Sequence, residues 1–434
     1  MKRTCTVELI VDEETEKRLK QLCDLSSKLW NEVNYARLKA WMEKKHIDFE
    51  ATYKEFYEKY KPLIGSATAQ TIIRKNDGAW RGFFELLKLK KEGRLPLFVK
   101  KIRPPGYRKK RKSRTLWTVI RKDRYKMDGD RIILRNLGTI GWIELRYKGL
   151  VYLRGERGEL RIRYDVDKGK WYAYVTFSKV SEKMMKGEWR PAPRQPKGNL
   201  TAGIDIGINN LMAVYVENGL TKLVNGKPLK AISFYWKRKI AEYQSTLNKY
   251  GLETSKRLRR MYTKWRRQVR HYMDTKVREA IEWLYNAGVS KIKVGYPRYI
   301  AQENGDFNNV HIWSYGYLLR RIAEVAEEHG ISVIYVDEAG TSSRCPLHGD
   351  GCGIRVYRGL FRCTQLNEIF NADIAAARNI LKTQVTEGVN NPRAPKRGGG
   401  NGRRPGQGLN LQKEGCSPNL PTLSGEEVIG RLLG

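Results

Sequence analysis

Long hydrophobic runs and cysteines are scarce in this sequence of 434 residues. No apolar run approaches the roughly 18 residues that a membrane-spanning helix needs. The N-terminus, MKRTCTVELIVDEETEK, lacks the apolar core of a signal peptide. We therefore expect no membrane partner and a cytoplasmic location, where the six cysteines would be reduced thiols or metal ligands and not a disulfide framework.

Acidic residues are also few. The 46 Asp and Glu stand against 84 Lys and Arg, which gives a net charge of +38 at pH 7. This excess predicts a polyanionic partner, because a Lys or Arg that contacts a phosphate releases condensed counterions. The 24 Tyr and 11 Trp exceed what a protein that only neutralises charge would need. Since aromatic rings stack on unpaired bases, nucleic acid is the expected partner.

The hydrophobic pattern divides the first half of the chain into strand, helix and strand. Residues 1–11 alternate as a strand does, a helical period runs from about 12 to 95, and alternation returns between 96 and 180. This order predicts that residues 1–198 form a β-barrel with a helical insert. The proline-rich stretch 190–199 is expected to link it to the second half.

The second half, residues 199–383, begins as an α/β unit. Residues 232–286 are predicted to form one or two long helices that are rich in Lys and Arg and interleaved with Trp and Tyr. The nearly uniform sign of their charge favours contact with phosphates over a solvated face. Residues 384–434 are dominated by Gly, Pro, Asn and Arg, a composition typical of a disordered basic tail.

The sharpest local motif is the stretch 202–214, AGIDIGINNLMAV, in which Asp205 interrupts an apolar strand. A carboxylate inside a strand costs free energy unless it meets a cation. The glycines on either side would let a bulky ligand approach the backbone. An Asp that caps a turn is the simpler alternative, but a metal-binding carboxylate fits the pattern better.

A second acid, Asp373, stands at the start of a helix in the stretch 370–380, FNADIAAARNI. The small residues after it would allow this helix to lie close on a sheet and bring Asp373 toward Asp205. Alone, Asp373 could be an ordinary acid in the first turn of a helix. Together, the two acids indicate a metal site.

Three cysteines and one histidine lie close together with the spacing C-x2-H-x3-C-x10-C: Cys345, His348, Cys352 and Cys363. Four soft or borderline ligands on two turns predict a structural, tetrahedral Zn²⁺ site. A finger that has lost its metal is the alternative. The finger is expected to span residues 341–368.

With these motifs the chain resembles TnpB, a family of transposon-associated, RNA-guided nucleases related to type V CRISPR effectors. The resemblance covers nearly the whole chain and is most specific at the GIDIG stretch around Asp205, the TSxxC start of the finger and the NAD helix start at Asp373. It implies a multidomain α+β fold. A wedge β-barrel with a helical recognition insert at about 12–95 would precede an RNase H-like (RuvC) domain with an inserted zinc finger.

The family's nuclease site takes one acid from each of three segments, and the second segment departs from the usual pattern here. A Glu is usual at the end of the strand 291–297, KIKVGYP, but Gly295 stands in its place. The best substitute is Glu338, which ends the next strand, because neighbouring strands lie about 4.8 Å apart. Glu303, in the loop after the glycine strand, is one rival. Asp337 is another, although strand alternation sends it to the opposite face from Glu338.

The resemblance thus implies that Asp205, Glu338 and Asp373 are catalytic and bind Mg²⁺. Phosphodiester hydrolysis needs an activated water and a stabilised leaving oxygen, and two Mg²⁺ ions roughly 3.5 to 4 Å apart supply both. Because Mg²⁺ prefers hard oxygen ligands, three carboxylates suit it.

The activity implied is RNA-guided cleavage of DNA next to a short motif, in a prokaryotic cell and near its nucleoid. The implied partners are a guide RNA from the transposon end and double- and single-stranded target DNA, with a transposase of the same element as a further candidate. Two alternatives stay open. A nuclease-dead, repressor-like RNA-guided binder is favoured by Gly295, whereas an unguided RuvC-type nuclease or transposase accessory protein would have no need of residues 1–198.

Overall fold

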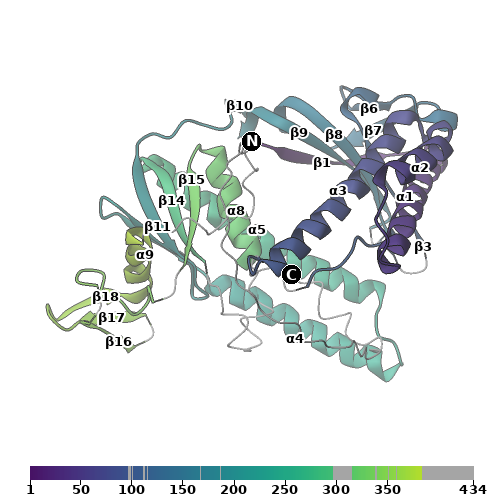
Figure 1. Cartoon of the computed structure of the whole chain (residues 1–434). Coiled ribbons are helices and arrows are strands. Elements are labelled where there is room, and N and C mark those ends of the chain that lie inside the picture. The colour runs from purple at the N-terminus through teal and green to yellow at the C-terminus, as the bar shows by residue number, and fades with distance from the viewer. Residues whose placement is uncertain are drawn as a thin grey trace, which may run out of the picture. The chain divides into compact units, whose positions relative to one another are not determined.

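The computed structural model of the chain describes residues 1–95, 99, 101–110, 113–114, 116–166, 168–185, 187–296, 315–337, 340–349, 351–357 and 359–383. By internal contacts the chain divides into two compact units (Figure 1). The first comprises residues 1–194 and 254–260, and the second residues 195–253 and 261 onward. Among the described helices, none combines the length and apolarity needed to cross a membrane.

The first unit is built on an eight-stranded antiparallel sheet that forms a near-barrel. Its order is β4 (Trp117–Ile120), β8 (Leu153–Asp165), β9 (Lys170–Met185), β1 (Arg3–Ile10), β7 (Ile143–Lys148), β6 (Arg131–Leu134) and β5 (Tyr125–Asp128), with β10 (Glu188–Pro191) paired to β9. A separate two-stranded ribbon joins β2 (Lys109–Lys110) and β3 (Ser113–Arg114). The predicted β-barrel is confirmed in this form.

Part of the stretch predicted as a linker is a strand. Arg190 and Pro191 belong to β10 and pair with Lys183 and Glu182 of β9. Because β10 is a short strand outside the main order of the sheet, the N–H that proline lacks interrupts no ladder between central strands. The link between the two units is therefore shorter than the composition of residues 190–199 indicates.

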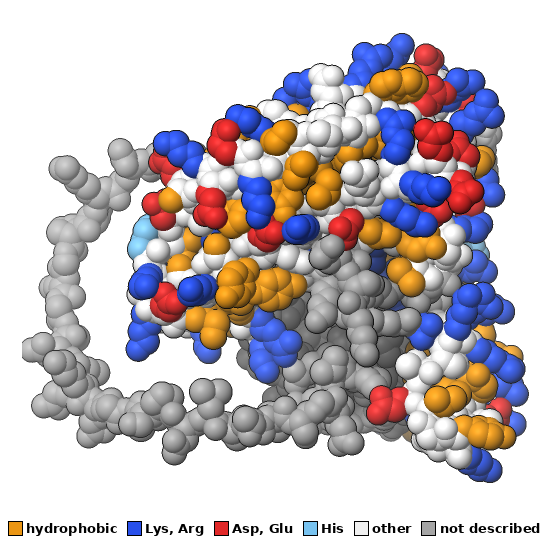
Figure 2. Space-filling model, turned by 90° about the vertical axis from the view of Figure 1, so that its right-hand side faces the viewer, with side chains coloured by type: hydrophobic (Ala, Val, Ile, Leu, Met, Phe, Trp, Pro, Cys, Tyr) orange, Lys and Arg blue, Asp and Glu red, His pale blue; other side chains and the backbone are white. Residues whose placement is uncertain are grey.

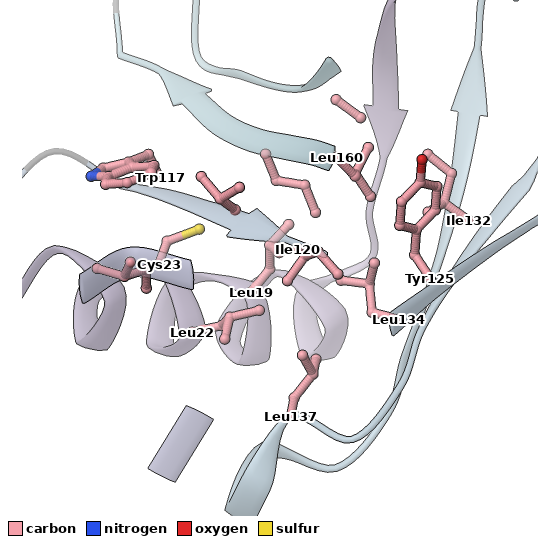
Figure 3. Close-up of a cluster of buried hydrophobic side chains, with 14 of the residues drawn as sticks. Leu19, Leu22, Cys23, Trp117, Ile120, Tyr125, Ile132, Leu134, Leu137 and Leu160 are labelled. Carbon is pink, nitrogen blue, oxygen red and sulfur yellow. The ribbon is translucent and has the colours of Figure 1, made fainter. Parts of the chain in front are cut away.

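Three helices form the predicted insert between β1 and β4: α1 (Glu13–Met42), α2 (Phe49–Ile64) and α3 (Ser66–Lys91). The first two begin at Asp12 and Asp48, whose carboxylates accept hydrogen bonds from backbone N–H groups of the first turn. Leu19 and Leu22 of α1 belong to one buried cluster with Ile120 and other side chains of the strands, and Cys23 of α1 lies beside Trp117 (Figure 3). The core of the first unit thus lies between the sheet and its helical insert.

The second unit contains a five-stranded sheet with the order β13 (Thr221–Asn225), β12 (Asn210–Val216), β11 (Leu200–Asp205), β14 (Val289–Tyr296) and β15 (Ser332–Asp337). The first three strands pair antiparallel, and β14 and β15 run parallel to β11. This mixed sheet, with β11 at its centre, is the predicted RNase H-like arrangement.

The remaining elements of this unit are α4 (Lys227–Lys249), α5 (Lys256–Asn286), α8 (Tyr315–Glu328), the finger strands β16 (Gly353–Tyr357), β17 (Leu360–Cys363) and β18 (Glu368–Asn371), and α9 (Ala372–Lys382). The basic region is two helices, the first of which begins five residues before the predicted residue 232. A proline in the first turn of α4 suits that earlier start, because proline has a helical φ and the first turn needs no N–H partner.

Gly203 sets how closely α9 approaches the central strand. A Cβ at this position would overlap the carbonyl oxygen of Ala377 and lie 2.8 Å from the backbone nitrogen of Leu381. Ala375, Ala376 and Ala377 are buried on the helix. The glycine before Asp205 therefore admits the backbone of a helix, and not the bulky ligand that the sequence suggested.

The variant Gly203→Ala should lower the free energy of unfolding by about 2 kcal/mol, because the added methyl group meets backbone atoms that cannot rotate away. Urea unfolding of the purified protein measures this change. Gly78→Ala is the matched control, because Gly78 lies within α3 and has nothing within 4 Å of the added carbon. That control should gain up to about 1 kcal/mol from the helix propensity of alanine. An equal response of the two variants would contradict the close seating of α9.

Candidate active site

Asp205 is the last residue of β11 and is partly buried at the carboxyl end of the central strand. Burial, and after it the negative charge of Asp373, raises the pKa of Asp205 to about 7. The guanidinium of Arg355, from finger strand β16, acts in the opposite direction. The structure thus brings the first and third predicted acids together, although they stand 168 residues apart in the sequence.

Asp373 is held by hydrogen bonds at two points. Its backbone N–H, like that of Ile374, donates to the side-chain oxygen of Asn371 over 3.1 Å, which caps α9. Its carboxylate accepts a 2.7 Å hydrogen bond from Nδ2 of Asn210, at the start of β12. Asn210 was missed as a site residue, although it stands five residues after Asp205 in the same motif.

The far end of α9 is held by Lys293, which projects from β14. Its Nζ donates to the carbonyl oxygens of Leu381 over 2.7 Å and Thr383 over 2.9 Å. A cation at these last carbonyls also favours the helix dipole. Lys293 was likewise missed, because β14 (VSKIKVGY) carries two lysines and the sequence alone does not single out the one that reaches α9.

The two strands that were predicted to flank the position of the second acid, β14 and β15, are neighbours in the sheet. In the parallel pair of β14 and β15, Gly295 lies opposite Val336 and Tyr296 opposite Asp337. Gly295 supplies no carboxylate. Glu338, its rival Glu303 and the side chain of Asp337 lie outside the described residues.

The finger residues Cys345, His348, Cys352 and Cys363 form one cluster, with all ligand atoms within 4.8 Å of one another. Nδ1 of His348 lies 3.8 Å, 3.3 Å and 3.4 Å from the Sγ atoms of Cys345, Cys352 and Cys363. The Sγ atoms of Cys352 and Cys363 are 3.9 Å apart. A tetrahedron with bonds of about 2.3 Å to sulfur and about 2.0 Å to nitrogen requires separations of roughly 3.6 to 3.8 Å. The cluster can therefore hold one metal ion.

The thiols of this cluster differ in acidity. Burial opposes ionisation of Cys345, but backbone hydrogen bonds at His348 and Leu347 outweigh it and lower the pKa of Cys345 to about 6. Burial and the neighbouring Cys345 and Cys363 raise the pKa of Cys352 to about 12. Cys345 is thus largely a thiolate at neutral pH, whereas Cys352 stays a thiol unless a cation offsets the neighbouring sulfurs.

The finger is tied directly to the helix that carries Asp373. Strand β18 ends at Asn371, the cap of α9. Nδ2 of Asn379 donates to the carbonyl oxygens of Thr341 and Arg344, both over 2.8 Å, and Nζ of Lys382 donates to Pro346 over 2.8 Å. The finger is therefore joined to α9 both by the chain itself and by these hydrogen bonds.

The basic helices present cations, but several of their aromatic rings hold the fold together. Lys264, Arg266 and Arg267 of α5 are exposed, and no described acid pairs with them. Nε1 of Trp265 donates to Ser233 Oγ over 3.3 Å, and the Tyr272 hydroxyl donates to a backbone oxygen of β13 over 2.6 Å. These two rings are therefore structural and not free to stack on bases.

Basic side chains are not confined to the two helices. On the face drawn in Figure 2, Lys and Arg side chains are spread over the visible surface, with Asp and Glu between them. Many of the acids are engaged in ion pairs, as Glu144 is with Arg131 at 2.6 Å. The excess of positive charge is therefore available to bind a polyanion in more than one region of the surface.

Known protein families match two stretches of the chain. The family described as a probable transposase (OrfB_IS605) matches residues 176–301, which include β11 and β14. The Cas12f1-like TNB domain matches residues 315–380, which include the finger and most of α9. Asp205 and Asp373, which the structure brings together, thus fall in different family segments.

Individual relatives extend the match to most of the chain. It is 36% identical over 414 residues to the TnpB-like protein ORF457 of Acidianus two-tailed virus, which covers 91% of this chain and 89% of that protein. Over 69 residues, 16% of each chain, it is 42% identical to the CRISPR-associated endodeoxyribonuclease Cas12f1 of Sulfoacidibacillus thermotolerans. Its fold matches a chain of the Cas12f1-sgRNA-target DNA complex with a TM-score of 0.54, at 12% identity, over 88% of this chain and 98% of that chain.

The stability of the metal-free protein should depend on the ionisation of Asp205. The unfolded carboxyl ionises near its ordinary pKa of 3.8 and the folded one near 7, so the folded state retains a proton that the unfolded state releases. Stability from this group is therefore present below about pH 4 and is lost as the pH rises through 7.

In the presence of a chelator, Asp205→Asn should raise the melting temperature at pH 8 and have little effect at pH 4, as measured by differential scanning fluorimetry. Asp123→Asn is the control with the opposite sign, because hydrogen bonds from Arg121 lower the pKa of Asp123 to about 2. That control should not gain stability at pH 8. A fall in melting temperature for Asp205→Asn at pH 8 would show that the carboxylate is not strained in the metal-free fold.

Proposed function

Because the chain belongs to the TnpB-like family, we propose that it is an RNA-guided DNA endonuclease that cleaves target DNA by Mg²⁺-dependent hydrolysis. The observation that carries this proposal is the pairing of Asp205 with Asp373 at the carboxyl end of the central strand. The charge of Asp373 helps to raise the pKa of Asp205, and a divalent cation between the two carboxylates would stabilise their ionised forms together. Their hard oxygen donors suit Mg²⁺ better than a softer metal.

Four residues of the site would act in this mechanism. Asp205 would hold Mg²⁺ from the end of the central strand, and Asp373 would hold it from the first turn of α9. Asn210 orients the Asp373 carboxylate through its 2.7 Å hydrogen bond, and Arg355 offsets part of the negative charge at Asp205. Bound Mg²⁺ would activate the attacking water and stabilise the leaving oxygen.

Glu338 is proposed as the third acid. Ile204 lies opposite Val294, so the next positions along the parallel pair are Asp205 and Gly295, and Val336 lies opposite Gly295 on the other side. Side chains opposite one another share a face, so Val336 lies on the face of Asp205 and Gly295, and Glu338 follows Val336 by two positions in the sequence. This register supports a glutamate that serves the site from the strand next to the glycine.

The finger is proposed to bind one structural Zn²⁺ through Cys345, His348, Cys352 and Cys363. Three sulfurs and one nitrogen fill all four positions of a tetrahedron, which leaves no open position for catalysis. Where the family usually has a fourth cysteine, Leu366 is 52% exposed. His348 is the proposed substitute, with Nδ1 as its ligand atom.

The proposed partners are a guide RNA derived from the transposon end and the double- and single-stranded forms of the target DNA. The structural match to the Cas12f1-sgRNA-target DNA complex and the net charge of +38 support them. Exposed cations such as Lys264 and Arg266 suit the phosphates of a guide–target duplex. A prokaryotic cytoplasm, close to the nucleoid, and a transposase of the same element complete this proposal.

One observation favours a second candidate, a guided DNA-binding protein that does not cut. Gly295 stands where the family usually has a glutamate, and a site with two carboxylates would hold two Mg²⁺ ions weakly. An unguided nuclease is less well supported, because it would not require the near-barrel and its helical insert.

Cleavage of a matched DNA target tests the proposal. Protein co-expressed with RNA from its own locus should cut the target only with Mg²⁺. Asp205→Ala and Asp373→Ala should each reduce the rate by at least about a thousandfold, since each removes a metal ligand. Glu338→Gln should do the same, whereas Glu303→Gln, the matched control, should retain most of the activity.

Two outcomes would overturn parts of this assignment. Cleavage that survives Glu338→Gln but not Glu303→Gln would move the third acid to Glu303. RNA-dependent binding of the target by the wild-type protein, without cutting under any divalent cation, would establish the second candidate instead.

Zinc content tests the finger. Atomic emission should find one zinc per chain in the wild type and in His348→Cys, which restores four thiolates. Cys363→Ala should lose the metal and also the cleavage activity, because the finger is bonded to α9. Cys5→Ala, a buried cysteine in the first unit, is the control and should keep its zinc. Full zinc occupancy in Cys363→Ala would exclude the proposed ligand set.

A further inference from the structure

In the first unit, the side chain of Arg108 occupies the corner between two buried tryptophan rings. Its Cζ lies 4.2 Å from the centre of the Trp30 ring and 4.4 Å from that of Trp117. The two rings meet edge to face, with their centres 6.1 Å apart. Two aromatic faces therefore fix the plane of this guanidinium.

The backbone around Arg108 is fixed as well. Nε1 of Trp30 donates to the carbonyl oxygen of Gly106 over 3.0 Å, and Nδ2 of Asn34 donates to that of Pro105 over 2.8 Å. The N–H of Arg108 itself donates to the side-chain oxygen of Asn31 over 2.6 Å. All three partners lie on α1, so the helix holds the arginine in one place before any ligand arrives.

Two further arginines stand beside this corner. Trp117 of β4 pairs with Arg163 of β8, and Val119 pairs with Arg161, so both arginines share the face of the sheet that carries Trp117. Both are exposed. Burial, and then the charges of Arg161 and Arg163, lower the pKa of Arg108.

No carboxylate within the described ranges pairs with Arg108, Arg161 or Arg163. Two acids of β8 stand two positions from these arginines, and each is engaged by a lysine: Glu159 by Lys75 at 2.6 Å and Asp165 by Lys168 at 3.8 Å. Two buried donors at this corner, Nε of Arg108 and Nε1 of Trp117, have no hydrogen-bond acceptor in the part of the chain that the structure describes. In Figure 3 the Trp117 nitrogen lies at the end of the ring that faces away from the other labelled side chains.

Two other stacked arginines of this unit, Arg37 and Arg154, are neutralised by acids. Arg37 lies over the Phe49 ring at 4.7 Å and pairs with Asp77 at 2.7 Å. Arg154 lies over the Trp189 ring at 4.0 Å and pairs with Glu182 at 3.3 Å. Stacking on an aromatic ring therefore does not explain why Arg108, Arg161 and Arg163 lie together with no acidic partner among the described residues.

We propose that Arg108, Arg161 and Arg163 together bind one backbone phosphate of a nucleic acid. This inference rests on the proposed function and assigns the first unit a specific contact with that nucleic acid. Guanidinium groups donate paired hydrogen bonds to phosphate oxygens, and the anion relieves the repulsion among the three cations. Tyr172 and Tyr174 of β9 lie opposite Arg163 and Arg161 and are partly exposed. Their rings would contact the sugar and base that follow such a phosphate.

Fluorescence anisotropy tests this site with full-length protein in EDTA, against labelled oligouridine and a labelled DNA duplex over a range of KCl concentrations. Arg108→Gln and Arg163→Gln should each weaken binding roughly tenfold and lower the slope of log affinity against log salt by about one. The double variant should lose less than the product of the two single losses, because the arginines share one phosphate.

Arg154→Gln is the matched control, since it removes a stacked arginine of the same strand whose charge Glu182 already balances. It should change affinity by less than about twofold. Arg163 is exposed and outside the core, so its variant remains informative even if Arg108→Gln fails to fold. Losses on oligouridine alone assign the phosphate to RNA, losses on the duplex alone assign it to DNA, and each supports the site.

Losses equal to that of Arg154→Gln, or a double loss equal to the product of the single losses, would overturn the shared phosphate site. Because binding is measured without Mg²⁺, the result is separate from cleavage. A protein that passes this test but never cuts keeps the site and loses the proposed nuclease activity, whereas one that cuts with unchanged binding by the variants loses only the site.

Discussion

The close packing of α9 on the central strand is the constraint on which the proposed nuclease site depends. Gly203 has no Cβ to hold the helix off, and Ala375, Ala376 and Ala377 are buried on α9. This approach places Asp373 near Asp205, and the raised pKa of Asp205 expresses the electrostatic cost of ionising that carboxyl. The packing energy of the helix therefore maintains a site that is strained until a cation arrives, as active sites commonly are.

The finger extends this constraint. Its last strand ends at the cap of α9, and Asn379 and Lys382 bond the helix to the first turn of the finger. Arg355 reaches the site electrostatically from the same finger. Metal held by the cysteine and histidine cluster would therefore act on catalysis indirectly, because it fixes the element that orients Asp373.

The two units offer cations in different ways. In the second, exposed residues of α5 present mobile side chains such as Lys264, which suit a phosphate backbone of variable position. In the first, the guanidinium of Arg108 is fixed by Trp30 and Trp117 and by a backbone bonded to α1. A preorganised arginine loses little conformational entropy on binding, so it favours one register of the ligand over its neighbours.

The sequence by itself determined what depends on local pattern: the near-barrel with its helical insert, the central strand that ends at Asp205, the helix that begins at Asp373 and the four residues of the finger cluster. Periodicity and spacing carry this information because hydrophobic faces and ligand sets repeat along the chain. Tertiary structure alone decided which distant residues meet. Three such contacts join segments that no local pattern connects: the hydrogen bond of Asn210 to Asp373, the bonds of Lys293 to the end of α9, and the cluster of Arg108, Arg161 and Arg163. Long-range contacts of this kind leave no period in the sequence.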